Sequence, residues 1–162
     1  MSASPITYRL ANESDIKELV RLRLAYLHAD FGELDPDDVQ MIEQQLPEYL
    51  ETHLTHDLHA QTAFCGDVMV GTCWLLVVEK PASVAFLHGR TGAIFNVYVD
   101  PAYRKQGIAR KLMLRLIDTA RTLKLDRLEL RATAMGFNLY RSIGFLEDES
   151  SHRAMNYVLG KN

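Results

Sequence analysis

A cluster of cations and one glycine mark the junction between an expected strand and an expected helix, at residues 97–113, VYVDPAYRKQGIARKLM. Arg104 and Lys105 precede Gly107, and an amphipathic run begins immediately after this glycine. The first turn of a helix leaves backbone N–H groups without partners, and the helix dipole favours an anion beside them. Gly107 has no side chain to block a close approach. The junction therefore predicts a phosphate or pyrophosphate site, although a solvated basic loop would have a similar composition.

The charge distribution favours an anionic ligand near the same junction. The formal net charge is only -3, yet residues 103–131 hold 9 Lys or Arg against 3 Asp or Glu, while residues 1–102 hold 6 against 15. Such a local excess indicates a local anionic ligand, because the chain as a whole is not basic. Neither a Walker A ending nor three spaced glycines accompany Gly107, so the two commonest nucleotide loops do not match.

The elements that must position this junction follow from hydrophobic periodicity. We expect a single α/β (α+β) domain over residues 1–162, with a mixed central sheet flanked by helices, in the order β-α-α-β-β-β-α-β-α-β. No repeat, linker or low-complexity tract interrupts it. The expected strands are residues 5–11, 58–65, 68–79, 93–100, 126–133 and 152–160, and the expected helices are 12–31, 36–54, 108–123 and 136–145.

Composition argues against membranes, metals and disulfides. No apolar run approaches the roughly 18 residues that a membrane helix needs, and the first residues lack an export signal, so we expect a cytoplasmic protein with no membrane partner. Cys65 and Cys73 lack metal-ligand spacing and are expected to be buried free thiols. His53, His56 and His59 would approach a metal site only on one continuous helix. Because the helix is expected to end near His53, we expect a solvated turn and no metal.

Two motifs together resemble a known family. Residues 99–113 resemble the acetyl-CoA-binding motif of the GNAT acetyltransferase superfamily, Arg/Gln-x-x-Gly-x-Gly/Ala after a strand, with Ala109 in the last place. Residues 139–145, LYRSIGF, resemble that family's LYxxxGF signature, in the right order and at the right separation. The resemblance implies a GNAT fold over essentially the whole chain. It also implies an N-acetyltransferase that moves acetyl from acetyl-CoA to a primary amine by direct attack in a ternary complex.

The resemblance also implies which positions contact the co-substrate. Three strand residues would pair with the pantetheine arm through their backbone, and six amides of the junction would hold the pyrophosphate. Two residues of the short helix are weaker candidates for the far end of the co-substrate. These positions are Val97, Tyr98 and Val99 for pantetheine, Arg104, Lys105, Gln106, Gly107, Ile108 and Ala109 for pyrophosphate, and Asn138 and Arg141 for the far end.

Tyr140 occupies the place of the family's usual general acid. Acetyl transfer from a thioester expels a thiolate of reference pKa about 8.5, and a phenol of pKa near 10 can return a proton at close range. The alternative is an aromatic ring that only packs. The general base is less evident, because the strand that often carries a glutamate in the family offers only Asp100, beyond its expected end. Asn96 cannot be a base, although it could orient a water or the substrate, so a water relay is preferred.

The acceptor remains open between several chemistries. Glu33 and Asp35, in the loop between the first two helices, could line its pocket, and the acidic N-terminal half suggests a cationic acceptor such as a polyamine, an aminoglycoside-like amine, or a protein lysine or N-terminus. The expected partners are thus a small-molecule or peptide amine and no nucleic acid, and a homodimer is a further possibility.

Two other functions compete with acetyl transfer. The missing strand carboxylate is compatible with a catalytically silent acetyl-CoA-binding regulatory module. Nucleic-acid binding through the outward cations of the expected helix 108–123 is disfavoured by the acidic remainder of the chain. Those cations are Arg110, Lys111, Arg115 and Arg121.

Overall fold

The computed structural model describes residues 4–160 and divides the chain after Arg131 into two compact units. The first unit comprises residues up to 131 and the second begins at residue 132, and each is described by itself. No helix within residues 4–160 is long and apolar enough to cross a membrane.

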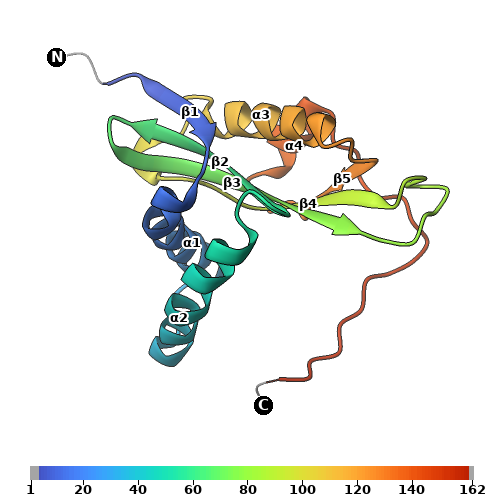
Figure 1. Cartoon of the computed structure of the whole chain (residues 1–162), viewed down its shortest axis with the longest axis horizontal. Helices are drawn as coiled ribbons and strands as arrows, with labels where there is room; N and C mark the ends of the chain where they lie inside the picture. Colours follow the sequence, from blue (N-terminus) through green and yellow to red (C-terminus); the bar gives the residue numbers. More distant parts are fainter. Residues whose placement is uncertain (1–3, 161–162) are drawn as a thin grey trace. The chain divides into compact units, whose positions relative to one another are not determined.

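A five-stranded sheet forms the centre of the first unit, with the strands side by side in chain order (Figure 1). The first four strands pair antiparallel and the last pair is parallel. The turn at Gly66 and Asp67 joins two long strands into the hairpin that the sequence predicts. The strands are β1 (Ile6–Leu10), β2 (Leu58–Cys65), β3 (Val68–Glu79), β4 (Arg90–Val99) and β5 (Arg127–Glu129).

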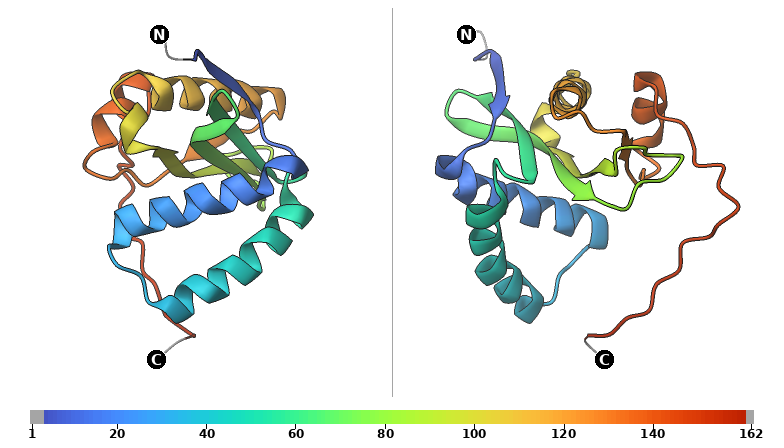
Figure 2. Two further views of the ribbon diagram at one scale, coloured as in Figure 1. Left: turned by 90° about the vertical axis from the view of Figure 1, so that its left-hand side faces the viewer. Right: turned by 45° about the vertical axis from the view of Figure 1, so that its right-hand side comes forward.

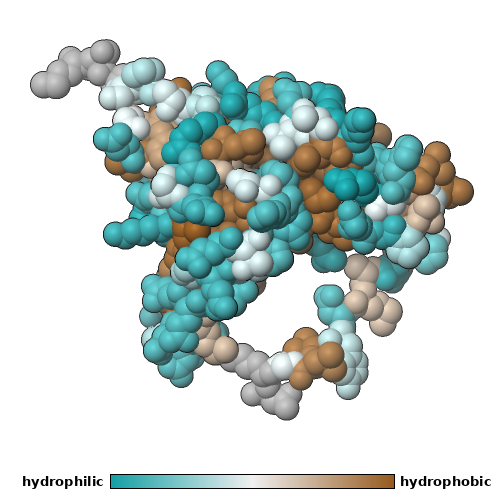
Figure 3. All heavy atoms as spheres, viewed as in Figure 1, coloured by the Kyte–Doolittle hydropathy of each residue, from teal (hydrophilic) through white to brown (hydrophobic). Residues whose placement is uncertain are grey.

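Helices cover both faces of this sheet (Figure 2). α1 (Ile16–Phe31) and α2 (Pro36–His53) lie on one face, and α3 (Ile108–Thr122) lies on the other. On the α1 face, Leu19, Leu50 and Trp74 are buried in one apolar cluster. α3 buries Leu112 and packs closely on β3, where the position of a Cβ on Gly71 would lie 3.3 Å from a methyl of that leucine. The outward surface over α2 is hydrophilic (Figure 3).

A capped turn precedes α1. A short 3-10 turn, η1 (Glu13–Asp15), leads into the helix, and the Asn12 side chain accepts from the Ser14 N–H at 2.9 Å. Asp15 accepts from the Asn12 N–H in return, which completes a capping box.

β4 keeps its pairing with β3 but loses its pairing with β5 over its second half. It pairs with β5 only from Thr91 to Ala93, so among the described residues no strand lies along its 94–99 segment on the side opposite β3. The register against β3 also shifts, because Trp74 faces Phe95 whereas Thr72 faces Tyr98. A β-bulge therefore lies between these pairs. The edge of β4 opposite β3 is therefore not paired with a strand over 94–99 in the described residues.

The mixed α/β fold class is confirmed, but the last two expected strands are not formed as predicted. β5 covers only three residues of the 126–133 expectation. The second unit contains α4 (Phe137–Ile143), which ends at Gly144 as expected, and residues 152–159 form no strand. A strand needs hydrogen-bond partners on a neighbour, and within the second unit the segment meets none. The alternating Met155, Tyr157 and Leu159 are instead exposed.

Candidate active site

The junction between β4 and α3 has an unusual backbone. A short turn, η2 (Pro101–Tyr103), follows β4, and two residues before the helix have positive φ, Lys105 at 62° and Gly107 at 76°. Gly107 is the N-cap, and the first helical hydrogen bond runs from the Lys111 N–H to its carbonyl at 3.1 Å. The amides of Ile108 and Ala109 precede that bond and are therefore not used by the helix. Left-handed residues before a helix turn successive N–H groups to one side, which makes a concavity for an anion.

The side chains around the junction mainly support its backbone. Arg104 Nε donates to the Val99 carbonyl at 2.8 Å, and its guanidinium lies over the Tyr98 ring. Asp100 caps η2 by accepting from the Ala102 N–H at 2.9 Å, so this carboxylate stabilises the turn at the strand end. The exposed Lys105 is left to supply positive charge at the surface of the loop.

The bulge in β4 turns two consecutive side chains to the α1 face. Phe95 packs against the cluster containing Leu19, and the neighbouring Asn96, at φ 53°, reaches α1 as well. Asn96 is 1% exposed, and its Oδ1 accepts from Arg23 Nη1 at 3.3 Å. Its Nδ2 is buried and has no hydrogen-bond partner among the residues described. The structure thus places Asn96 at the open segment of β4, and its Nδ2 is a hydrogen-bond donor without a partner among the described residues.

Arg23, which the sequence analysis did not single out, lies half-buried in an aromatic setting. Its guanidinium is 5.6 Å from the Tyr26 ring centre, 5.8 Å from that of Trp74 and 5.7 Å from that of Phe95. Burial lowers the pKa of Arg23 below its usual value. The signal was present in the sequence, because Arg23 falls at helical spacing within the apolar stripe that includes Leu19 and Leu27.

The two acidic candidates of the α1–α2 loop are exposed. Asp35 is the N-cap of α2 and accepts from the Asp37 N–H at 2.8 Å, which gives it a structural role. In the described part of the chain, no hydrogen bond or ion pair joins Asp35 or Glu33 to Asn96 or Arg23. Their contact with an acceptor stays a prediction.

In the second unit, Tyr140 is held by close neighbours. The position of a Cβ on Gly136 would lie 2.8 Å from the Tyr140 ring, and the Phe145 ring meets it edge-on with centres 6.1 Å apart. Gly136 is thus needed for the ring to lie where it does, a requirement that the sequence analysis missed. Asn138 is exposed, and Arg141 forms a 3.5 Å ion pair with Glu147.

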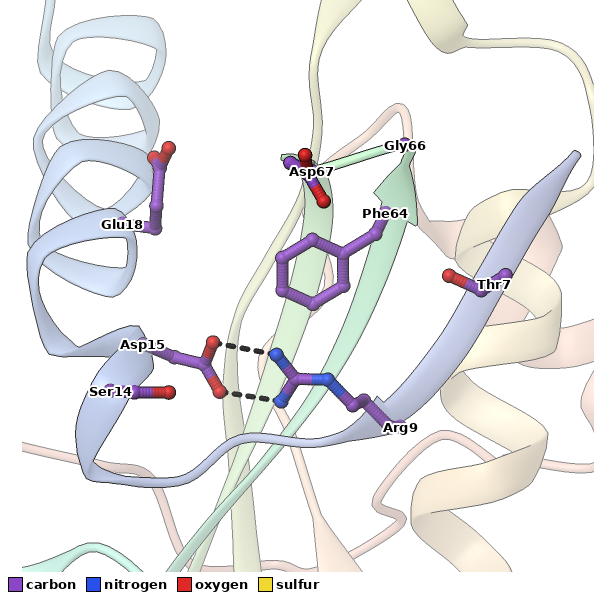
Figure 4. A pocket seen from close by; sticks show the side chains of 8 residues that line it. All are labelled: Thr7, Arg9, Ser14, Asp15, Glu18, Phe64, Gly66 and Asp67. Carbon is purple, nitrogen blue, oxygen red and sulfur yellow. Dashed lines mark hydrogen bonds and ion pairs between the residues drawn. The ribbon is translucent and has the colours of Figure 1, made fainter. Parts of the chain in front are cut away.

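A separate hollow of about 320 Å³ lies between the start of α1 and the β2–β3 turn (Figure 4). The Arg9 guanidinium donates two hydrogen bonds of 2.6 and 2.8 Å to the Asp15 carboxylate, and these bonds lower the pKa of that carboxyl. Glu18, which also lines the hollow, pairs with Arg21. Because these charges pair with one another, we interpret the hollow as part of the β1–α1 junction. Its lining residues are Thr7, Arg9, Ser14, Asp15, Glu18, Phe64, Gly66 and Asp67.

The cysteines and histidines do not form a reactive centre. Both thiols are free, and complete burial raises the pKa of Cys73 well above its usual range, so this thiol stays protonated and inert. α2 ends at His53, and His59 lies in β2, which confirms the predicted turn between them. Over residues 4–160, no group of three or more His, Cys, Asp or Glu side chains could hold a metal ion.

Comparisons with known proteins identify the class of enzyme that this fold and site define, an acyl-CoA-dependent N-acetyltransferase with acetyl-CoA as co-substrate. The chain belongs to the acetyltransferase (GNAT) family, whose sequence model matches residues 17–145. No curated protein matches the chain to a significant degree.

Solved structures share the fold over almost the whole chain. A predicted acetyltransferase from Clostridium acetobutylicum, solved with acetyl-CoA, is 26% identical, with a TM-score of 0.83 over 94% of this chain and 96% of that one. A GCN5-related N-acetyltransferase from Ralstonia eutropha is 24% identical, with a TM-score of 0.79 over 93% and 99%. A ribosomal-protein-alanine N-acetyltransferase from Brucella melitensis is 24% identical, with a TM-score of 0.67 over 94% and 100%.

Proposed function

We propose that this enzyme transfers the acetyl group of acetyl-CoA to a primary amine of a small-molecule or peptide acceptor, by direct attack in a ternary complex. The observation that carries the proposal is the open 94–99 edge of β4, which is joined through η2 and the 104–107 loop to the unused amides at the start of α3. An extended amide-containing chain can pair with an open strand edge, and a pyrophosphate can follow it onto the helix N-terminus.

The backbone of the first unit fits acetyl-CoA along this path. Residues 97–99 would pair with the pantetheine arm, and the amides of residues 104–109 would hold the pyrophosphate, with Gly107 allowing the closest approach. The Arg104 side chain is engaged with the end of β4, so it would shape the loop more than grip the phosphates. Asn138 and Arg141 remain our candidates for the far end of the co-substrate.

The chemistry needs one nucleophile and one acid. The acceptor nitrogen attacks the thioester carbonyl carbon, the C–N bond forms, the C–S bond breaks, and the thiolate takes a proton from the Tyr140 hydroxyl. The proton of the amine passes to an ordered water, because Asn96 cannot accept it and Asp100 is committed to η2. The protonated Cys73 gives no covalent route, which favours direct transfer.

Release of free thiol from acetyl-CoA tests the proposal. The purified protein is assayed against amines, peptides and antibiotics, and acetyl-CoA binding is measured by calorimetry. The panel includes aminoglycosides and peptides with N-terminal alanine, since similar folds are named for those acceptors. We expect binding together with transfer to at least one amine. Tight binding with no transfer across the panel would favour a silent acetyl-CoA-binding module.

We further propose that residues 1–162 act as one GNAT domain, because the region that matches the family crosses residue 131. Two free thiols are consistent with a reducing cytoplasm as the place of action. A homodimer stays a prediction that sedimentation at several concentrations can test.

A further inference from the structure

A half-buried cation on α1 lies next to the open segment of β4. Arg23 has three aromatic neighbours, and its one recorded hydrogen bond within the described chain is the 3.3 Å contact to the Asn96 amide oxygen. No carboxylate lies within ion-pair distance of this guanidinium in residues 4–160. A cation withdrawn from water without a counter-charge is unfavourable, so it attracts an anion.

Asn96 adds a second, independent sign that an acceptor of hydrogen bonds belongs here. Its amide is 1% exposed, and its Nδ2 is a buried donor without a partner among the described residues. Buried donors in folded proteins are nearly always satisfied. Together, Arg23 and Asn96 present more N–H donors than the surrounding side chains can accept, and the rings of Tyr26, Trp74 and Phe95 accept none conventionally.

We propose that Arg23 binds a carboxylate carried by the acceptor itself, so that the preferred acceptor is a small molecule with both an amine and a carboxylate, such as a free amino acid. This inference rests on the proposed acetyl transfer. Arg23 is the specificity-determining residue, and Asn96 is a positioning residue that holds its guanidinium. A guanidinium matches the two oxygens of one carboxylate, whereas a doubly charged phosphate usually needs a second cation, which the aromatic and amide neighbours do not supply.

The position of the pair suits a small acceptor. Asn96 directly precedes the 97–99 segment along which we place pantetheine, and the bulge turns its side chain to the α1 face. A carboxylate on Arg23 would therefore hold an amine only a few bonds away beside the segment that presents the thioester. The expectation from overall charge, a cationic acceptor, is thereby narrowed to an acceptor that carries both an amine and a carboxylate.

The test compares acceptors that differ in one group. Thiol release is measured with proteinogenic amino acids, with their carboxamides and with their decarboxylated amines. The amine pKa values of the two counterparts lie on either side of that of the amino acid, so basicity alone cannot imitate a carboxylate preference. We expect the highest kcat/KM with a carboxylate-bearing amine and a loss on the order of 10- to 100-fold with both counterparts.

Variants of Arg23 test whether this residue causes the preference for a carboxylate-bearing acceptor. Arg23→Met, which can fill the aromatic surroundings, should raise KM for the carboxylate-bearing acceptor by a similar factor. It should leave the Kd for acetyl-CoA and the kcat/KM of the decarboxylated amine unchanged. Arg23→Lys keeps a positive charge and should retain part of the preference for the carboxylate-bearing acceptor. If the Met variant is unstable, the Lys variant replaces it, and a melting temperature close to that of wild type shows that it is folded. Lys17→Gln, which removes one exposed charge from the same helix, is the matched control and should behave as wild type.

The outcomes separate the two claims. Transfer only to amines without a carboxylate, or an unchanged KM in a folded Arg23→Met protein, overturns the carboxylate inference and leaves acetyl transfer standing. Binding of acetyl-CoA without transfer to any amine overturns acetyl transfer, and this inference falls with it.

Discussion

At the residue scale, a substitution of Gly107 tests whether backbone amides or charged side chains bind the pyrophosphate. Its φ of 76° is strained for a branched residue, and a Cβ there would project into open space where we place the ligand. We expect Gly107→Val to weaken acetyl-CoA binding about 10-fold or more, since several amides would move. Lys105→Ala should have a smaller effect. Isothermal titration calorimetry measures both.

Gly32 provides the control for the Gly107 variant. It ends α1 with φ 78°, also faces open space, and has no place in the proposed site. Gly32→Val should lower stability while leaving acetyl-CoA affinity intact. Equal effects of the Gly107 and Lys105 substitutions, or a larger one for Lys105→Ala, would mean that side-chain charge does most of the holding.

Tyr140 is the residue on which the acid assignment depends. Tyr140→Phe keeps the ring between Gly136 and Phe145 but removes the hydroxyl, so kcat should fall about 100-fold with little change in the Kd for acetyl-CoA. The pH profile of kcat should lose its alkaline limb. The exposed Tyr157 gives the control Tyr157→Phe. Undiminished turnover across pH in Tyr140→Phe would leave the ring with only a packing role.

At the scale of elements, the β1–α1 junction depends on one ion pair. Arg9 lowers the pKa of Asp15 below its ordinary 3.8, so the pair stabilises the fold above that pH and the contribution is lost as pH falls through the folded-state pKa. Because Arg9 is 46% exposed, we expect Asp15→Asn to cost only about 1–2 kcal/mol at pH 7.

Urea unfolding at pH 7, 5, 4 and 3 checks the sign of this effect. The difference between wild type and Asp15→Asn should be largest at neutral pH and should shrink toward pH 3. Asp67→Asn, which changes a carboxylate in the same hollow, should show little difference at any pH. A gap of the same size at pH 3 as at pH 7 would assign the loss to packing or capping instead.

The same elements show what could be predicted from the sequence. The bounds of β2 and β3 and the start of α3 after Gly107 depend on neighbours in the chain, and all of them were predicted correctly. The bulge at Asn96 depends on the register against β3, which alternation in β4 alone does not reveal. The prediction of a strand at residues 152–160 was wrong for a similar reason, because an alternating pattern does not supply a strand to pair with.

At the scale of the whole molecule, regular structure is unevenly distributed. Residues 146–160 are exposed throughout and have no helix or strand. Proteases cut where backbone can enter their active sites, so trypsin should cleave after Arg153 first. Arg121 is similarly exposed but lies in α3, and cleavage there should be much slower. Mass spectrometry over a time course measures both rates. Protection of Arg153 that disappears on dilution would indicate that a second copy covers this segment.

The bulge in β4 makes the length of this strand as important as its composition. Phe95, Asn96 and Tyr98 all face α1, an arrangement that requires one residue more than strict alternation with β3 would supply. Deleting Asn96 would leave one residue opposite Cys73, so Phe95 and Tyr98 would keep their partners Trp74 and Thr72 and still face α1, but the polar side chain that meets Arg23 would be lost. The inserted residue thus adds one inward polar side chain and leaves the strand pairing on either side of it unchanged.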